Sequence, residues 1–477
     1  MVFQNNVLSG AGGSGTTTYA IGQSIRINDD DNAYLSRTLS TASDGGKTYT
    51  FSWWQKLGSK YGAQAQYIIH TDLSGGTPAD YLYWYNDNLQ YWSGSLYLRT
   101  DREFRDPSAW YHFVFVRDTT QAVSSERLRL YINGIRETSF STENYPSLNA
   151  TSYFNTNTAH YIGGANTSSN RLDSYMAEIH FLDGLGYDPS FFGEFNSSGI
   201  WIPKEYTGSY GSNGFKIDGR DSSDLGDDES GNGNDFTSNN LTASDQVSDS
   251  PTNNFPTFNP IYADASGINS ITLANGNLQG TGTSGQFAHK TATFNLPQSG
   301  KWYFEYYLGG LYTGFGICIV GQEASIAGGY GFGALSTSQG FGYQNDSIYN
   351  GNAVTTAFGL GNRSAGDILN VAVDVDNDKF YLGINNTYIA ADGGADGNPS
   401  SGTNPTVTTS FSLSTNDIIL GFYLSSSSSS VYLNFGQEGT FAGNKTAGGN
   451  SDANGIGNFL YSVPTGFKAL CTKNLGS

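Results

Sequence analysis

The sequence predicts an all-β protein built from two sandwich-like domains, and three observations predict it. Charged residues make up only 14% of the 477 residues, and aromatic residues make up another 14%. Aromatic side chains favour strands, and the 62 Gly favour tight turns. Short alternating runs recur along the chain with Gly or Asn between them, which is the pattern of a β-sandwich or barrel.

The first predicted domain covers residues 17–190 and follows a Gly/Ser/Thr-rich stretch, residues 1–16, that we expect to be a flexible arm. Within it, alternation in TYTFSWWQKL places Tyr49, Phe51 and Trp53 on one face of a strand. Successive strand patterns continue to the end of this domain, so we expect a packed sandwich.

Three local signals punctuate this domain. Asn86–Asn88 and Asn133–Gly134 each separate two strand patterns and predict hairpin turns. The segment 188–195 opens with Asp188 and Pro189, which is typical of the start of a short helix. No longer helical pattern is present.

The next segment, residues 191–262, is acidic and rich in Gly and Asn, and we expect a connector with some strand content. Strand patterns return over the second predicted domain, residues 263–477. The clearest is the hairpin Val371–Leu382, with its turn at Asn377 and Asp378. The serine run 425–430 is expected to be a loop.

Charge and cysteine content exclude several classes of function. Lys and Arg total 23 against 42 Asp and Glu, so the net charge of −19 argues against binding of nucleic acid or of an anionic membrane surface. No run of 18 apolar residues predicts membrane insertion, and the first residues show no secretory signal pattern. Cys318 and Cys471 are too few for a disulfide scaffold, so both are expected to be buried.

Two resemblances refine the predicted fold. SIRINDDDNAYLSR, YTFSWWQK, WYHFVFVRD and YIGGANTSSNRLDSYMAEIHFLDG, within 17–185, resemble the laminin-G-like, concanavalin-type jelly roll. KWYFEYYLGG, GDILNVAVDVDNDKFYLGIN and VYLNFGQ, within 285–472, resemble a SPRY-type domain. The second stretch departs from that family at Asn385–Thr387, where an Asn-Gly is usual. The resemblances imply two concanavalin-like β-sandwiches joined by the acidic connector.

The connector and the order of the parts resemble structural or fibre proteins of tailed phages, marine ones in particular. This resemblance implies a virion protein at the tail, a fibre or the head surface, which is assembled in the host cytoplasm. Its partners would be other capsid or tail proteins and a host-surface glycan. Because repeated weak sites gain from avidity, we expect a homo-oligomer, with a trimer as one hypothesis.

No catalytic residues are predicted. The five histidines form no metal-binding motif and are expected to be structural; they are His70, His112, His160, His180 and His289. A depolymerase on a concanavalin-type fold needs paired carboxylates on one strand face. The nearest candidates are Asp374, Asp376 and Asp378, which we expect to be solvated at a hairpin tip.

Calcium is the one cofactor that the sequence suggests. The acidic connector offers oxygen ligands, of which Asp221, Asp224, Asp227 and Asp228 are the predicted set, although no EF-hand spacing is present.

Aromatic residues are the candidate carbohydrate-binding site. They gather on one predicted hairpin, at Tyr81, Tyr83, Trp84, Tyr85 and Trp92. By alternation, the three tyrosines share one face and Trp84 lies on the other. One face must fill the core, and the second is left open as a sugar-stacking platform or a subunit contact.

The function expected from these observations is non-enzymatic: lectin-like sandwiches of a virion protein adhere to a host glycan. Two alternatives stay open, namely a decoration protein that binds only virion subunits, and a polysaccharide depolymerase.

Overall fold

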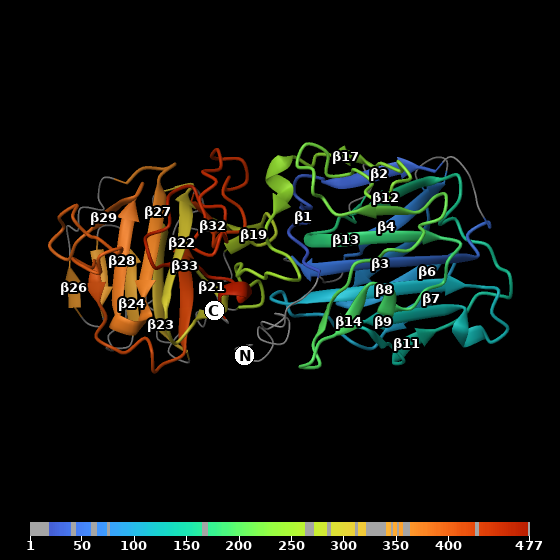
Figure 1. Cartoon of the computed structure of the whole chain (residues 1–477), viewed down its shortest axis with the longest axis horizontal. Coiled ribbons are helices and arrows are strands. Elements are labelled where there is room, and N and C mark those ends of the chain that lie inside the picture. The colour runs from blue at the N-terminus through green and yellow to red at the C-terminus, as the bar shows by residue number, and fades with distance from the viewer. Residues whose placement is uncertain are drawn as a thin grey trace. The chain divides into compact units, whose positions relative to one another are not determined.

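The computed structural model describes residues 19–39, 44–58, 64–73, 77–164, 170–262, 271–283, 288–310, 313–320, 340–344, 347–350, 353–355, 363–424 and 429–475. Contacts divide the chain between Asn254 and Phe255 into two compact units. Within the described ranges, strands dominate both units, with short 3-10 turns and the four-residue helix α2 (Thr472–Leu475) (Figure 1). The all-β prediction is confirmed. The predicted arm at 1–16 and most of the serine run lie outside the described residues.

The first unit is a sandwich of two antiparallel sheets, A and B. Sheet A has the order β10 (Ile135–Arg136), β9 (Leu128–Ile132), β8 (Trp110–Asp118), β3 (Thr48–Leu57), β13 (Ser174–Asp183), β1 (Ser24–Ile27) and β18 (Gln246–Val247), with β16 (Phe215–Ile217) also paired to β13. Sheet B has the order β11 (Phe140–Glu143), β7 (Leu96–Thr100), β6 (Asn88–Ser93), β5 (Thr77–Tyr85), β4 (Gln66–Leu73), β12 (Ala159–Ile162), β2 (Tyr34–Thr38) and β17 (Thr237–Asn239). Figure 1 shows β13, β3 and β8 side by side.

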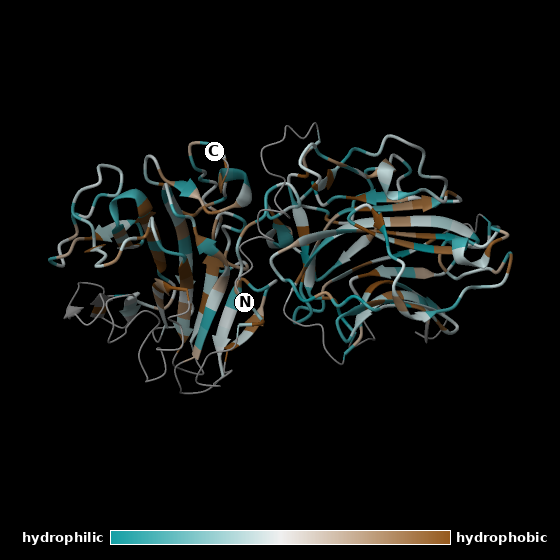
Figure 2. Ribbon diagram, turned by 90° about the horizontal axis from the view of Figure 1, so that it is seen from below, coloured by the Kyte–Doolittle hydropathy of each residue, from teal (hydrophilic) through white to brown (hydrophobic). Residues whose placement is uncertain are grey.

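Aromatic residues fill the space between the two sheets. Trp53 of β3 stacks on Phe113 of β8, with ring centroids 5.2 Å apart, and Trp84 of β5 meets Phe113 edge-on from the opposite sheet. All three are buried, as alternation predicts for Trp53. Figure 2 shows hydrophobic residues concentrated in the strands and hydrophilic ones in the loops.

Residues 191–254, predicted as part of a connector, belong to the first unit. β16 pairs with β13, β17 pairs with β2 and β18 pairs with β1, while the hairpin β14 (Gly193–Phe195) and β15 (Trp201–Pro203) forms a small sheet of its own. Phe215 and Phe236 enter the core, where their rings meet edge-on at 4.7 Å. A few apolar residues in a polar, Gly-rich stretch are therefore enough to complete both sheets.

The second unit is also built from two sheets. One has the order β19 (Ile271–Ala274), β20 (Gln279–Gly282), β32 (Ser430–Asn434), β22 (Lys301–Leu308), β27 (Ile368–Asp374), β28 (Lys379–Ile384) and β29 (Thr387–Ile389), with β30 (Val407–Thr408) and β33 (Lys468–Ala469) on its sides. The other has the order β21 (Ala288–Leu296), β31 (Ile418–Leu424), β23 (Thr313–Ile319), β24 (Gly340–Gln344), β25 (Ser347–Asn350) and β26 (Ala353–Thr355). Cys318 and Cys471 are both buried, as predicted.

The predicted hairpin of the second unit forms as β27 and β28, and Asp378 takes a left-handed backbone conformation (φ 54°) at its turn. The expectation that its tip carries solvated acids is wrong for Asp374. This residue is 1% exposed and pairs with Lys301 at 2.9 Å, because the next strand of the sheet brings that lysine beside it.

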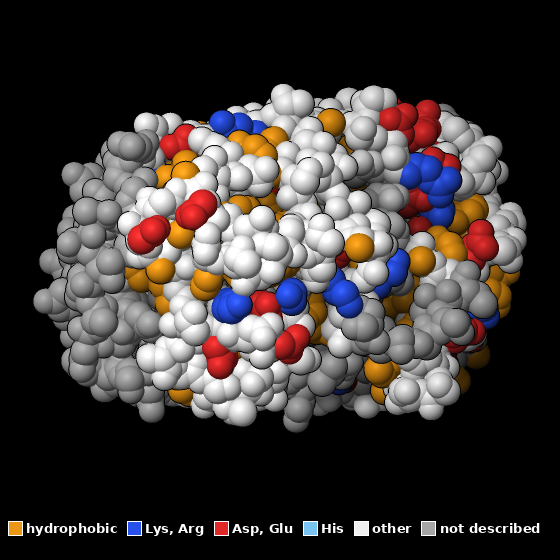
Figure 3. Space-filling view, turned by 60° about the vertical axis from the view of Figure 1, so that its left-hand side comes forward, with side chains coloured by type: hydrophobic (Ala, Val, Ile, Leu, Met, Phe, Trp, Pro, Cys, Tyr) orange, Lys and Arg blue, Asp and Glu red, His pale blue; other side chains and the backbone are white. Residues whose placement is uncertain are grey.

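Charge is sparse on the face drawn in Figure 3, where Lys and Arg side chains and Asp and Glu side chains stand in small separate groups among neutral polar atoms. Among the described residues drawn there, Lys and Arg side chains do not gather into one broad patch. Among the residues that the structure describes, no helix is long and apolar enough to span a bilayer.

Candidate functional site

The predicted aromatic hairpin forms as β5 and β6, joined by Asn86 and Asp87, which both have positive φ (50° and 63°). This is the turn that the Asn-rich sequence predicts. Alternation places Tyr81, Tyr83 and Tyr85 on the outer face of sheet B. Tyr81 and Tyr85 are partly exposed, and Tyr83 is 9% exposed.

Trp84 has to be removed from the predicted carbohydrate site. It is fully buried and packs edge-on against Phe104 and Phe113 in the core. The opposite sheet covers the face of β5 that carries Trp84, so no ligand reaches this ring. Trp92 of β6 stays on the outer face and is partly exposed.

Strand register aligns aromatic side chains in one row across sheet B. Trp92 of β6 pairs with Tyr81 of β5, Tyr81 with His70 of β4, and His70 with Tyr161 of β12. Directly paired residues of antiparallel strands project from the same face, so these four side chains form a line perpendicular to the strands. We call Trp92, Tyr81, His70 and Tyr161 the aromatic row.

The rings of the aromatic row contact one another and their neighbours. His70 stacks on Tyr161 at 4.9 Å with an interplanar angle of 15°, and Tyr81 lies parallel to Trp92 at 5.9 Å and 10°. Tyr67 bridges the two pairs, with its ring 4.8 Å from His70 and 5.1 Å from Tyr81. A continuous aromatic strip therefore crosses four strands.

Polar groups border this strip. Tyr83 donates a hydrogen bond from its hydroxyl to Oε1 of Gln90 at 2.7 Å, and Arg99 donates to Oδ1 of Asn88. Burial, reinforced by neighbouring Tyr67, raises the pKa of Tyr83 to about 12, so its phenol is uncharged at neutral pH. The rim thus combines amide groups and hydroxyls with apolar ring surface.

His70 differs from the expected satisfied histidine. It is 0% exposed, and neither ring nitrogen forms a hydrogen bond within the described structure; Nε2 lies 3.5 Å from Oδ1 of Asp72. Burial lowers the pKa of His70 to about 3, so the ring is neutral. Sequence analysis missed its place in the row, because a register shift between Tyr67 and Ile69 breaks the alternation in Gln66–Leu73.

The other histidines of the first unit are satisfied, as predicted. His160 accepts the backbone N–H of Asn155 at 3.1 Å. His112 accepts a hydrogen bond from Nε1 of Trp201 on Nδ1, at 3.0 Å, which leaves Nε2–H to donate to Oγ of Ser52 at 2.9 Å.

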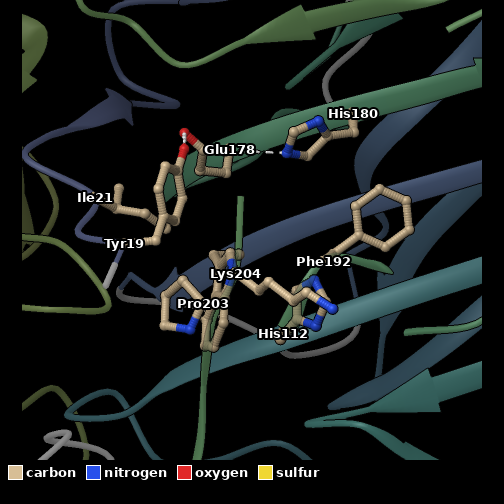
Figure 4. Close-up of a pocket in the computed structure, with 9 residues that line it drawn as sticks. Tyr19, Ile21, His112, Glu178, His180, Phe192, Pro203 and Lys204 are labelled. Carbon is tan, nitrogen blue, oxygen red and sulfur yellow. Dashed lines mark hydrogen bonds and ion pairs between the residues drawn. The ribbon is translucent and has the colours of Figure 1, made fainter. Parts of the chain in front are cut away.

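A separate hollow lies on the outer side of sheet A, in the first unit. It is shallow and has no enclosed room for a water molecule; the 170 Å³ of space between its side chains includes open solvent. Its lining consists of Tyr19, Ile21, Trp54, His112, Glu178, His180, Phe192, Pro203 and Lys204. Figure 4 shows Glu178 between Tyr19 and His180, bonded to both.

Glu178 is the centre of this hollow. It sits at a register shift of β13 with φ 47°, an unusual value for a residue other than glycine. Oε1 accepts from the hydroxyl of Tyr19 at 2.8 Å, and Oε2 lies 3.0 Å from Nε2 of His180. Burial raises the pKa of Glu178, but hydrogen bonding to His180 and the charge of Lys216 outweigh it and lower the pKa to about 2.

The carboxylate of Glu178 is therefore occupied by the protein itself. Lys216 bridges it to Asp218, with Nζ 3.2 Å from an oxygen of each. His180 pairs with Glu178 as well, and Arg220 pairs with Asp218, so each carboxylate has two basic partners. The hydrogen bond from Tyr19 and the ion pair with Lys216 thus attach two chain segments to Glu178 of β13 in sheet A.

The predicted calcium ligands are engaged in turns. Asp221 accepts the backbone N–H of Ser223, Asp224 that of Gly226 and Asp228 that of Lys216. The pKa of Asp227 is raised by burial and then by nearby carboxylates. Over the described ranges, no three His, Cys, Asp or Glu side chains form a group that could hold a metal ion.

Adding calcium is therefore expected to leave the melting temperature of the protein unchanged, because most of these carboxylates already accept backbone hydrogen bonds. Differential scanning calorimetry in calcium and in chelator measures this. A calcium-dependent rise in melting temperature that Asp224→Asn abolishes would confirm the predicted site.

Comparison with known protein families supports the predicted fold of the first unit. Residues 29–185 match a laminin-G family model of the concanavalin A-like lectin/glucanases superfamily. No curated protein matches the chain.

Several solved structures share parts of the architecture. A putative carbohydrate-binding protein of Bacteroides ovatus is 16% identical over 46% of this chain and 59% of its own length, with a TM-score of 0.28. The SPRY domain of human HERC1 is 18% identical over 34% and 91%, with a TM-score of 0.24. A heptameric SAP-like pentraxin of Limulus polyphemus is 14% identical over 35% and 78%, with a TM-score of 0.26.

The family match is confined to the first unit and confirms its predicted fold. The first unit therefore has a laminin-G-like, concanavalin-type lectin/glucanase fold.

Proposed function

We propose that the first unit binds carbohydrate on the outer face of sheet B. The observation that carries this proposal is the aromatic row, which three register pairs align across four strands. Sugars bury their C–H groups against aromatic surface and satisfy their hydroxyls on nearby amides and hydroxyls, and the rim offers both. The lectin/glucanase superfamily match of residues 29–185 supports the same class of ligand.

A neutral glycan fits this surface better than an anionic one. The protein carries a net charge of −19, which repels polyanions at long range. Arg99, a cation at the rim, is already hydrogen-bonded to Asn88. Recognition would depend on apolar contact and neutral hydrogen bonds.

Replacing Trp92 by alanine is expected to weaken binding of a recognised glycan by about tenfold or more, because a tryptophan that the ligand covers is a typical hot spot. Binding is first located on a glycan array and then measured by isothermal titration calorimetry. The matched control is Tyr153→Ala, since Tyr153 is 46% exposed outside the aromatic row and its loss should leave affinity unchanged. Equal affinities of wild type and Trp92→Ala for every glycan that binds, long chains included, would contradict the proposal.

We propose that binding occurs without hydrolysis. The acid pair Glu178 and Asp218, which Lys216 bridges, lies at sheet A and not beside the aromatic row of sheet B. A depolymerase would release reducing ends from the bound polysaccharide. Incubation of bound glycan with the protein, followed by a reducing-end assay, decides between a binding module and that alternative.

We also propose that the protein works on the surface of a phage particle as a fibre or decoration subunit, which the resemblance of its connector and domain order supports. Its partners would then be capsid or tail proteins, and a homo-oligomer would multiply weak glycan sites. Labelling of whole particles tests the location, and light scattering tests the oligomer. Tight binding to virion proteins with no binding to host cells would favour pure decoration.

A further inference from the structure

The aromatic row specifies the shape of the ligand, and this inference rests on the proposed function. We infer that sheet B binds an extended, neutral glycan chain lying across its strands, rather than a single terminal sugar.

The direction follows from the register. The row runs perpendicular to the strands, from β6 through β5 and β4 to β12. Neighbouring strands lie about 4.8 Å apart, so the row spans about 14 Å from Trp92 to Tyr161. One strand spacing is close to the length of one sugar ring along an extended chain. The row therefore spans the length of about three consecutive rings. Trp92, Tyr81 and Tyr161 are its partly exposed rings, and the fully buried His70 supports Tyr161 from beneath the surface.

The surroundings of Tyr161, at one end of the aromatic row, also favour binding of an extended glycan chain. Beyond Tyr161, the register continues to Ser36 of β2 and then to Thr237 of β17. Ser36 is partly exposed and Thr237 is exposed. Small hydroxyl side chains extend the line there, with the ring of Tyr34 beside it, 6.0 Å from that of Tyr161, so a chain can continue past Tyr161.

The row is also rigid. Tyr161 is held by stacking on His70, whose ring is fully buried, and Trp92 is held parallel to Tyr81. Rings that are already fixed lose little conformational freedom on binding, so each contact contributes fully to affinity. The two terminal rings, Trp92 and Tyr161, are both partly exposed, and they are the contacts that only a long ligand can make together.

The test is the dependence of affinity on chain length. Linear, neutral oligosaccharides of glucose, with β-1,4, β-1,3 or α-1,4 linkage and one to six rings, are titrated into the full-length protein by calorimetry. In the series that binds, we expect the dissociation constant to fall by at least about tenfold from one ring to four and then to level off.

Variants at the two ends of the row sharpen this test. Trp92→Ala and Tyr161→Ala should each weaken four-ring binding strongly and leave two-ring binding nearly unchanged, whereas Trp92→Phe and Tyr161→Phe should retain most of the length dependence. Tyr153→Ala is the control outside the row. Thermal unfolding establishes that each variant is folded.

The outcomes separate the inference from the proposed function. A single sugar that binds as tightly as the four-ring chain, with both bindings lost in Trp92→Ala, overturns the extended-chain inference and keeps the carbohydrate site. Binding of no neutral saccharide, on the array or in these series, overturns both.

Discussion

Replacing Asp249 by alanine is expected to lower the free energy of unfolding of the first unit by about 3–5 kcal/mol, the usual cost of leaving a buried charge without its partner. Lys56 of β3 and Asp249 form an ion pair at 2.7 Å in which both side chains are 0% exposed. Asp249 also accepts a hydrogen bond from Nε1 of Trp110 at 2.9 Å, so the variant leaves two donors buried without this acceptor.

The measurement is urea denaturation of the full-length protein, followed by hydrogen exchange of peptides from each unit. Asp249→Asn keeps an acceptor oxygen but removes the charge, so its effect should be intermediate. Arg105→Ala is the control, because Arg105 is 61% exposed in its pairs with Glu103 and Asp87, and pairs at the surface contribute little. An unchanged midpoint for Asp249→Ala would show that Lys56 finds another partner or loses its proton.

Acid is expected to destabilise the first unit from about pH 6.5 downward, well before it affects the second. Burial lowers the pKa of His70 and His112 to about 3 and that of His160 to about 4. Below the ordinary histidine pKa, the unfolded chain binds protons that the folded unit does not, so stability falls with pH and is fully present only above 6.5.

Each of these histidines contributes a slope of about 1.4 kcal/mol per pH unit, so together they give about 4 kcal/mol per unit between roughly pH 6 and 4. Glu178 adds to the loss at lower pH, since its pKa of about 2 means that its stabilisation disappears as pH falls from 4.5 toward 2. The second unit contains one histidine, His289.

Urea denaturation at a series of pH values measures how the free energy of unfolding changes with pH. Hydrogen exchange of peptides from each unit shows which unit loses stability. His160→Gln should reduce the slope of the free energy of unfolding against pH by about one third relative to wild type. This reduction is expected even if the variant is less stable than wild type at neutral pH. Equal acid sensitivity of both units would contradict the assignment to buried histidines.

Local patterns in the sequence predict much of this architecture. The turn at Asn86 and Asp87 was predictable because both residue types tolerate positive φ. Alternation correctly places Tyr81 and Tyr83 on one face of β5 and Trp84 on the other. Which face meets the core depends on the opposite sheet, so alternation alone did not exclude Trp84 from the binding site.

The parts that sequence analysis missed depend on distant pairing. β18 has two residues, and β16 and β17 have three each, so none carries a periodic pattern, and their segment was interpreted as a connector. Irregular pairing between β4 and β5 near Tyr67 shifts the register that brings His70 opposite Tyr81. Such bulges have no local signature, and for this reason the complete aromatic row emerged only from the structure.

The position of β18 beside β1 has a consequence for biosynthesis. β1 is the first strand of the unit along the chain and β18 the last, and they pair at Ile25 and Gln246. A nascent chain that has emerged from the ribosome only to residue 185 contains all of the family-matched region but not the counter-ion of Lys56. The unit can complete its fold only after translation has passed Asn254, and a recombinant fragment needs the same boundary.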